Sequence, residues 1–566
     1  MNDIRRTILW VIFGFSLVLL WDKWQIHNGR KPTFFPTPEV TAQAPAETVG
    51  TDTGLPAASA NPAATANASN VPGTAAADTA APAAAREKLT VASDLLRLTF
   101  DSEGASLVGA ELLKYADQDD KTKAIKLLDE SANRVYVAQT GLIGGNFPTH
   151  KTAMTAKPGP RELADGQNEL SVVFESPDLG GVKLVKTWTL KRGDYAIGLK
   201  QEVVNTGSAA VNPQLYLQLT RDGNKPPGES SFYSTFTGPA VYTEAKKYHK
   251  VDFKDIENGK TDSVDKSADN GYVAMVQHYF ASAWLLPQGT QRDIYVRKAG
   301  SNLYSVGEIT HLGEIAPGQS KSIDARLFVG PQIEKTLEAI APGLELVKDY
   351  GWVTILAKPL YWLLDKLHSF IGNWGWSIVA LVLLLKIAFY WLNAKAYSSM
   401  AKMKAINPRI MEMRERLKDK PQQMQQEMMR IYREEKVNPM GGCFPIVIQI
   451  PVFIALYWVL LSSVEIRNAP WIGWIHDLSV PDPFFILPVL MTLSSLLQTA
   501  LNPAPPDPMQ AKMMWIMPLM FSVMFFFFPA GLVLYWLTNN VLSIAQQWII
   551  NTRMGVPPQF NLPKFK

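Results

Sequence analysis

Five long apolar runs near the C-terminus constrain the fold more than any other feature of this sequence. They occupy residues 374–392, 444–461, 484–501, 513–528 and 532–550. Each is long enough to cross the hydrocarbon core of a bilayer, about 30 Å thick, when its flanks are counted. Backbone polar groups inside a bilayer must be satisfied within the segment, and a helix does this. The runs therefore predict five core helices of a membrane domain.

The N-terminal segment predicts a sixth membrane helix. Arg5 and Arg6 precede an apolar run over 8–20, and Trp21 and Trp24 follow it. No small-x-small cleavage site comes promptly after the run, so we expect an uncleaved anchor over residues 1–28 with its arginines in the cytoplasm. A cleaved signal peptide is the alternative.

The charges of the connecting segments orient these helices. The segment 395–440 carries eleven Lys or Arg residues and six acids, which predicts a basic cytoplasmic hairpin. The loop 463–483 has one arginine and three acids, and the tail 551–566 has three basic residues and no acid. Six spans with both termini in the cytoplasm place every segment on the side that its charge favours.

Between the anchor and the membrane domain, the sequence reads as a soluble region. Residues 29–88 are rich in Ala, Pro and Thr and predict a disordered tether. Residues 89–340 alternate apolar and polar side chains between turn signals, which predicts an extracytoplasmic antiparallel β-sandwich. The clearest runs are 169–174, 181–190, 196–204, 214–220, 272–280, 293–299 and 323–329. No catalytic motif lies within them, so this domain is either a docking surface or a structural one.

Residues 341–371 mix charged side chains with apolar ones near helical spacing. This pattern predicts an amphipathic helix lying on the outer membrane surface rather than a span.

Lys386 is the candidate site residue with the clearest physical meaning. It is flanked by apolar residues on both sides within the first core span. A cation there costs about 2.5–3.5 kcal/mol on insertion scales, so it normally faces protein or a wet cavity. The alternative is that the lysine snorkels to the cytoplasmic end of its helix.

Polar residues on other spans are possible companions of Lys386. Tyr535, Asn539 and Gln546 fall on one face of the last span, and Gln449 lies in the second core span. Such residues either line a groove or join helices by hydrogen bonds. Further polar candidates within the membrane domain are Gln498, Thr538, Asn540 and Gln547.

The predicted hairpin carries two apolar stripes rich in methionine on either side of Pro421. Methionines suit surfaces that accept varied apolar partners, but the stripes can equally pack on each other. The stripes comprise Ile410, Met413, Leu417, Met424, Met428 and Ile431.

The composition gives no indication of an enzyme, a metal site or a cofactor. Cys443 is the only cysteine, and the seven histidines have no metal-binding spacing. No nucleotide-binding loop or pair of catalytic groups is visible, so we expect neither a catalytic residue, nor a metal, nor a cofactor.

The C-terminal part resembles the YidC branch of the membrane insertase family. The resemblance covers about 200 residues, and the anchor, tether and β-domain are similar to Gram-negative members. It is carried by NWGWSIVALVLLLK (373–386), AYSSMAKMKAINPRI (396–410), NPMGGCFPIVIQIPVFIALYWVL (438–460), APWIGWIHDLSVPDPFFILPVLM (469–491) and FPAGLVLYWLTNNVLSIAQQ (528–547).

The resemblance implies a hydrophilic groove that receives polar parts of a substrate. Lys386 stands where many members carry arginine, and Gln449 and Trp536 match other groove positions. Ile450, Pro451 and Phe453 match the substrate-contacting helix. Val382 replaces a polar residue, which implies a drier groove wall.

The implied function is insertion and folding of integral proteins of the bacterial inner membrane. Expected partners are nascent membrane proteins, the Sec translocon, the lipid bilayer, and the ribosome through the hairpin and the basic tail. A secondary transporter is the alternative, although the sequence has no internal repeat and no acid in its core spans.

Overall fold

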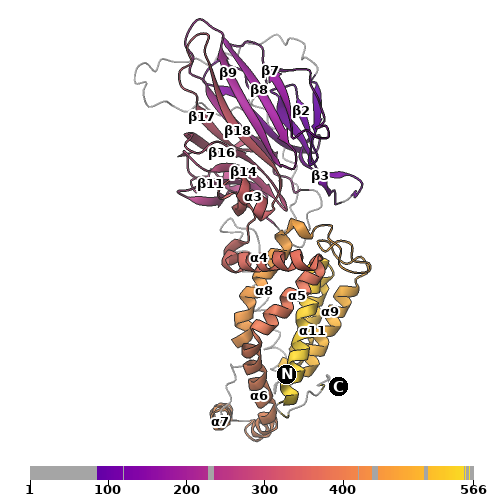
Figure 1. The fold of residues 1–566 in the computed structure, drawn as a ribbon. Helices are drawn as coiled ribbons and strands as arrows, with labels where there is room; N and C mark the ends of the chain where they lie inside the picture. The colour runs from indigo at the N-terminus through magenta and orange to yellow at the C-terminus, as the bar shows by residue number, and fades with distance from the viewer. Residues whose placement is uncertain are drawn as a thin grey trace. The chain divides into compact units, whose positions relative to one another are not determined.

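The structure is a computed structural model that describes residues 86–118, 120–226, 235–418, 420–435, 444–502, 508–553, 555 and 560. The anchor predicted for 1–28 and nearly all of the tether predicted for 29–88 lie outside the described residues, as does Cys443. The described residues form two compact units that divide after Lys348 (Figure 1).

The first unit consists of two nine-stranded antiparallel sheets. One has the order β1-β2-β3-β4-β5-β10-β17-β16-β13 and the other β12-β11-β14-β15-β18-β9-β8-β7-β6. The strands are β1 (Lys88–Ala92), β2 (Leu96–Asp101), β3 (Ser106–Ala116), β4 (Ala124–Ser131), β5 (Arg134–Ile143), β6 (Thr155–Ala156), β7 (Glu169–Glu175), β8 (Val182–Lys191), β9 (Ala196–Asn205), β10 (Gln214–Asp222), β11 (Gly238–Thr243), β12 (Lys247–Lys250), β13 (Ser267–Ala268), β14 (Tyr272–Gln277), β15 (Phe280–Leu285), β16 (Arg292–Gly300), β17 (Leu303–His311) and β18 (Ser320–Pro331). Two short helices, α2 (Phe253–Glu257) and α3 (Glu334–Ile340), and the 3-10 turn η1 (Leu344–Val347) accompany them.

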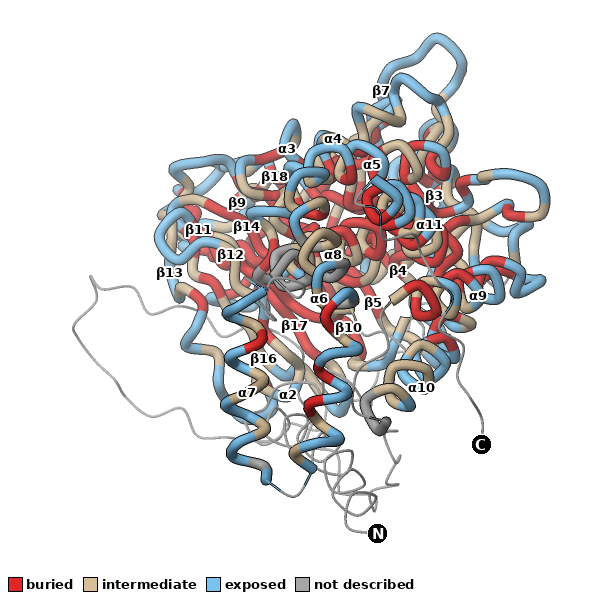
Figure 2. The backbone as a smooth tube through the Cα atoms, turned by 90° about the horizontal axis from the view of Figure 1, so that it is seen from below, coloured by how far each residue is buried: buried red, intermediate tan, exposed pale blue. Residues whose placement is uncertain are grey.

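Aromatic side chains from both sheets meet in the core of this unit. The Phe100 ring on β2 lies 5.2 Å from that of Trp188 and 5.6 Å from that of Phe174, both on the opposite sheet. The hydroxyl groups of Tyr136 on β5 and Ser282 on β15 join the sheets at 2.6 Å. The predicted antiparallel β-sandwich is therefore confirmed, and Figure 2 shows its strands largely buried.

One predicted strand is wrong. The run 272–280 is not a single strand. It contains β14, the turn of a hairpin and the first residue of β15, and Gln277 pairs with Phe280 across that turn. Tyr279 takes a left-handed conformation, with φ of 68°. This backbone state is uncommon for a residue with a side chain, and a period-two pattern gives no sign of it.

The second unit is helical. It contains η2 (Gly351–Val353), α4 (Thr354–Ile371), α5 (Trp374–Ala388), α6 (Tyr390–Arg416), α7 (Pro421–Glu434), α8 (Phe444–Ser462), η3 (Val464–Ile466), α9 (Ile486–Leu501), α10 (Pro508–Phe525) and α11 (Ala530–Arg553). No single helix among the described residues is long and apolar enough to qualify alone as a membrane span. The pair Trp374–Ala388 and Tyr390–Ser399, bent by 61°, qualifies together, and shorter apolar stretches are Gln449–Ser462, Ile486–Leu501 and Ala511–Phe525.

The first predicted core span is thus broken rather than continuous. The chain bends by 61° where α5 gives way to α6, at Phe389. Neither proline nor glycine lies at this point, so periodicity alone could not reveal the break.

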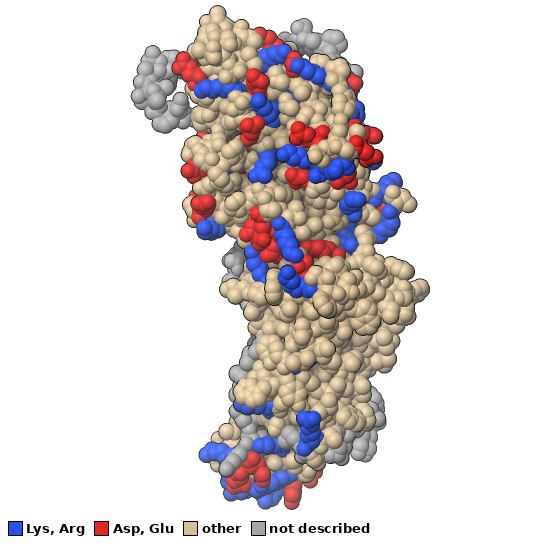
Figure 3. All heavy atoms as spheres, viewed as in Figure 1, with Lys and Arg blue, Asp and Glu red and all other residues tan. Residues whose placement is uncertain are grey.

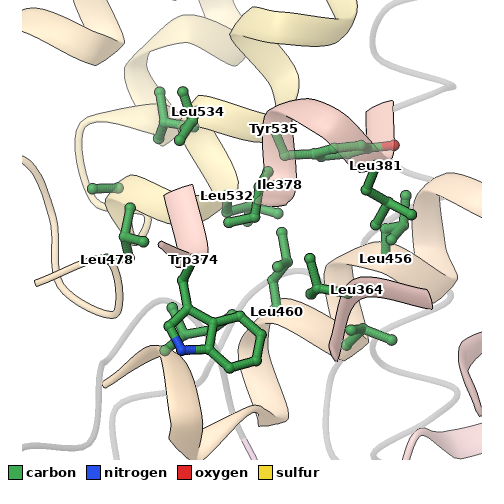
Figure 4. Close-up of a cluster of buried hydrophobic side chains, with 14 of the residues drawn as sticks. Leu364, Trp374, Ile378, Leu381, Leu456, Leu460, Leu478, Leu532, Leu534 and Tyr535 are labelled. Carbon is green, nitrogen blue, oxygen red and sulfur yellow. The ribbon is translucent and has the colours of Figure 1, made fainter. Parts of the chain in front are cut away.

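Helix α4 is amphipathic, as the sequence predicts, but it begins only at Thr354, and the predicted helix before it is replaced by η1 and η2. Ala357, Tyr361 and Leu364 are buried, whereas Ile355 is 86% and Trp362 59% exposed. The buried residues join a core shared by α5, α8 and α11 (Figure 4).

Packing at the start of α5 fixes that helix to the loop that follows α8. The Asn373 side chain accepts a hydrogen bond from the Trp376 amide at 3.1 Å and donates to the carbonyl of Trp471. A β-carbon on Gly375 would lie 2.2 Å from the Trp471 ring, so only glycine allows this approach.

The hairpin helices α6 and α7 pack their apolar stripes against each other. Ile406, Ile410, Met413 and Ile431 are buried together, with Met424 and Met428 against them. Met413, Met424 and Met428 therefore serve the hairpin's own core, whereas Met411 and Met429 are exposed. Figure 2 shows the outer side of α7 exposed.

The side chain of Lys186 is buried between the two sheets of the β-sandwich. It is 0% exposed, and its ammonium donates to the carbonyls of Gly104 at 2.6 Å and Thr140 at 2.8 Å. Burial lowers the pKa of this ammonium to about 7. These hydrogen bonds connect strand β8 to the opposite sheet. In return, the ammonium loses its hydration.

We predict that the stability of this unit rises with pH above about 7 because of Lys186. The unfolded lysine titrates near pH 10.4, so between the two values the unfolded state binds more protons. The rise is at most about 1.4 kcal/mol per pH unit and should vanish in Lys186→Met. Pulse proteolysis of the full-length protein in urea at pH 7 and pH 9 measures it. Lys191→Met, at an exposed position on the same strand, should keep the wild-type slope; equal slopes in all three proteins would contradict the prediction.

Candidate functional site

Lys386 lies inside the helical unit. It is 6% exposed, and its ammonium donates to the Ser543 hydroxyl on α11 at 2.7 Å. Lys386 lies in the last turn of α5, but its ammonium is buried against α11, whereas the snorkelling alternative would place it in water. Among the described residues, no carboxylate forms an ion pair with Lys386.

A chain of polar groups connects Lys386 to α8. The Ser543 hydroxyl donates to the carbonyl of Asn539 at 2.7 Å. The side-chain oxygen of Asn539 accepts from the Gln449 amide at 3.3 Å. Three helices, α5, α8 and α11, therefore contribute polar groups to one place.

Of these groups, Lys386, Asn539 and Gln449 line a small cavity, and Ser543 does not. Its polar lining comes from four helices, α5, α6, α8 and α11, and its apolar lining includes Val382, the position expected to make the wall drier. The lining residues are Val382, Leu385, Lys386, Phe389, Asn393, Gln449, Val452, Tyr535 and Asn539.

The fold holds these side chains in place from one end. Next to the cavity, α5, α8 and α11 share a core that includes Ile378, Leu381, Leu456 and Leu532 (Figure 4). Tyr535, 3% exposed, belongs both to this core and to the cavity wall. The polar groups are thus carried by a rigid apolar scaffold.

Four of the predicted groove residues meet at this cavity, and Trp536 does not line it. Lys386, Gln449, Tyr535 and Asn539 are in its wall. The Trp536 ring instead lies between those of Phe453 and Phe525, at 5.0 Å and 4.9 Å.

The predicted substrate-contacting residues lie on α8 next to the cavity. Ile450 is 48% exposed, and Pro451 and Phe453 are half-buried. The Phe453 ring packs 5.2 Å from that of Tyr535. Val452, between them, reaches the cavity wall.

The other polar candidates on α11 join helices. Asn540 donates to the Ser495 hydroxyl on α9 at 2.9 Å, and Gln547 donates to the Asn502 side chain at 3.1 Å. For these two residues, the structure matches the hydrogen-bonding alternative.

Sequence reasoning missed Ser543 and Asn393. Ser543 follows Asn539 by four residues on the same face of α11, so the spacing contained a signal. Asn393 follows Lys386 by seven residues, but the helix break at Phe389 lies between them.

The site can hold a polar or anionic group without performing bond chemistry. A lysine ammonium has three N–H donors, and Ser543 takes one. Among the described residues, no group of three His, Cys, Asp or Glu side chains is placed to hold a metal ion.

Two family models together match most of the chain. Residues 88–363 match the family model described as YidC periplasmic domain. Residues 366–556 match the model described as 60Kd inner membrane protein.

Individual relatives agree with the family models. The membrane protein insertase YidC of Cupriavidus metallidurans is 58% identical over 556 residues, covering 98% of each chain. That of Janthinobacterium sp. is 51% identical over 570 residues, covering 98% of this chain and 100% of the relative. A crystal structure of an active YidC insertase with its first transmembrane domain resolved covers 81% of this chain and 91% of its own at 18% identity, with a TM-score of 0.36, too low to add support. By sequence identity over the full length, this chain belongs to the YidC family of membrane protein insertases.

Proposed function

We propose that this protein inserts and folds integral proteins of the bacterial inner membrane. The observation that carries the proposal is the buried ammonium of Lys386 beside a polar cavity in a family of insertases. The periplasmic family model over 88–363 agrees with a large domain outside the cytoplasmic membrane.

The proposed topology has six transmembrane helices, with both termini in the cytoplasm. The loop charges support it, because the hairpin is basic and the 463–483 loop is acidic. Figure 3 adds that the viewed face of the helical unit is nearly free of charged side chains until the hairpin, where basic and acidic side chains gather. Such a charge-free band is what lipid requires.

The proposed mechanism is partitioning. A hydrophilic tail of the substrate enters the cavity, where Gln449, Asn539 and Lys386 replace part of its hydration. The adjoining apolar segment then passes along α8 and α10, the third and fifth of the six helices, into lipid. Transfer of its apolar surface supplies the driving force, at about 25 cal/mol per Å². No bond is made or broken, so this function is not enzymatic.

Apolar residues on both helices support this route. Ile450 on α8 is 48% exposed, and Met520 and Val523 on α10 are 63% and 62% exposed. Pro451 and Phe453 flank the cavity-facing Val452 on α8.

The proposed cytoplasmic partner is the ribosome, bound through the hairpin and the basic tail. Arg416, Lys418 and Lys420 lie around the hairpin tip, where α6 ends and α7 begins. We further propose that the protein acts alone or beside the Sec translocon. The secondary-transporter alternative finds no support in relatives whose names are those of insertases.

Replacing Lys386 should separate substrates by charge. Lys386→Ala should lower insertion of a substrate with an acidic tail by about tenfold or more, because a charge-assisted hydrogen bond is lost. Lys386→Arg should keep insertion, since the positive charge remains. Insertion into membrane vesicles, read by protease protection of the tail, measures both.

A substrate with a neutral tail is the internal control. It should insert equally well with wild type and Lys386→Ala. Equal insertion of the acidic and neutral substrates by Lys386→Ala would contradict the role of the charge.

Reversing charges at the hairpin tip should weaken ribosome binding. In Arg416→Glu, Lys418→Glu, Lys420→Glu protein, up to three phosphate contacts are lost, which lowers the salt slope of binding by about 2 to 3. Co-sedimentation at rising salt measures the slope. Lys191→Glu, Lys200→Glu protein, changed at exposed positions of the β-sandwich, should bind as wild type; an unchanged slope in the triple variant would exclude the tip as the contact.

A further inference from the structure

The break between α5 and α6 is held by one side chain of α11, that of Gln546. Its amide nitrogen donates to the carbonyl of Lys386 at 3.2 Å, and its oxygen accepts from the Asn393 amide at 3.2 Å. One glutamine thus bonds to residues on both sides of a 61° bend.

The bend has no other obvious local cause. Sharp kinks usually occur at proline, at glycine, at a bulge, or where a side chain enters the helical hydrogen-bond ladder. Residues 385–393 contain neither proline nor glycine. The carbonyl of Lys386 lies in the last turn of α5, where carbonyls lack intrahelical donors. Gln546 supplies such a donor.

Burial makes these bonds costly to lose. Asn393 is 7% exposed and Gln546 is half-buried, both in a part of the protein that we place in the membrane. An amide left without its partner there would lose a hydrogen bond that water cannot readily replace. The three groups, which we name the bend bracket, are therefore expected to keep or change their geometry together.

The bend bracket joins the cavity to the hairpin. Lys386 provides the ammonium of the cavity through its side chain and one end of the bracket through its backbone. Asn393 also lines the cavity and stands near the start of α6. From there α6 continues as one helix of 27 residues, about 40 Å long, into the hairpin.

A second contact on α6 strengthens the connection. The Tyr397 hydroxyl, one turn after Asn393, donates to the carbonyl of Ser543 at 3.4 Å. Ser543 is also the residue whose hydroxyl accepts from the Lys386 ammonium. Any tilt of α6 against α11 therefore acts on both partners of that hydrogen bond.

We infer that Gln546 is a positioning residue that sets the angle between α5 and α6 and thereby couples the hairpin to the Lys386 cavity. This inference rests on the proposed insertase function. A partner that binds the hairpin and tilts α6 would change the position of Asn393, and through Gln546 that of the Lys386 backbone. Hairpin binding would then alter the cavity that receives the substrate.

Distance measurements between spin labels test the inference without relying on activity. In a Cys443→Ser background, labels at Met411→Cys on α6 and Thr552→Cys on α11 report the angle of α6. We expect one narrow distance distribution in the otherwise unchanged protein and a clearly broader one in Gln546→Met, which has similar volume but cannot bridge the break.

Gln547→Leu is the matched control. It removes a neighbouring amide that bonds to Asn502 and the Leu501 carbonyl rather than to the bracket. Its distribution should stay narrow. Asn393→Leu, which removes the other end of the bracket, should broaden the distribution as Gln546→Met does. The double variant Gln546→Met, Asn393→Leu should broaden it no further than either single variant. A narrow distribution in both single variants would overturn the inference.

Insertion assays then separate this inference from the proposed function. Gln546→Met should slow insertion by about 2- to 30-fold, the range that such coupling gives, for acidic and neutral tails alike. If Lys386→Ala inserts normally while Gln546→Met broadens the distances, the proposed role of the cavity fails but the bracket stands. If Gln546→Met keeps the narrow distance distribution and also inserts at the full rate, the inference about the bracket is contradicted, and the proposed role of the cavity is not affected.

Discussion

The helical unit depends on one solution to an electrostatic problem: an ammonium within an otherwise apolar helix. Lys386 is nearly inaccessible, and its hydrogen bond to Ser543 requires α5 and α11 to lie side by side. The polar chain through Asn539 then reaches Gln449, so α8 is drawn to the same place. Because an unpartnered buried charge is expensive, satisfying this group adds to the apolar packing that holds the three helices together.

The same arrangement separates polar groups that join helices from those that line the cavity. Asn540 donates to Ser495 on α9, and Gln547 donates to Asn502, so these amides join helices. The ammonium of Lys386, with three donors and one hydroxyl partner among the described residues, retains capacity for an acceptor in the cavity. Under the proposed function, such a partly satisfied group would attract a substrate without trapping it.

Much of this could be predicted from sequence because the constraints are local. A lone lysine in an apolar run and a polar face on the last helix both follow from composition and helical period. Trp536 shows where the family resemblance and the structure differ. The resemblance implies a groove position, but Trp536 follows Tyr535 by one residue and so lies about 100° further around the helix, away from the cavity. Ser543 was inconspicuous because a serine in a helix can bond to its own backbone, as it does here with the Asn539 carbonyl.

Other features depend on tertiary contacts that no periodic pattern encodes. The bend at Phe389 is associated with Gln546, which is more than 150 residues away in sequence. The turn at Tyr279 divides what alternation alone presents as one strand. In the hairpin, the sequence left open whether the methionine stripes face binding partners or each other. In the structure, Met424 and Met428 pack against α6 and so belong to the hairpin's own core.

Site-specific photocrosslinking from the cavity to a nascent chain tests the central claim most directly. A photoreactive residue at Leu385, in the cavity wall, should crosslink to the hydrophilic tail of a ribosome-bound membrane protein during insertion. The same residue at Ile549, 48% exposed on α11 and outside the cavity wall, should not. Efficient insertion with no crosslink at Leu385, or with equal crosslinking at Ile549, would contradict the claim that this cavity receives the substrate.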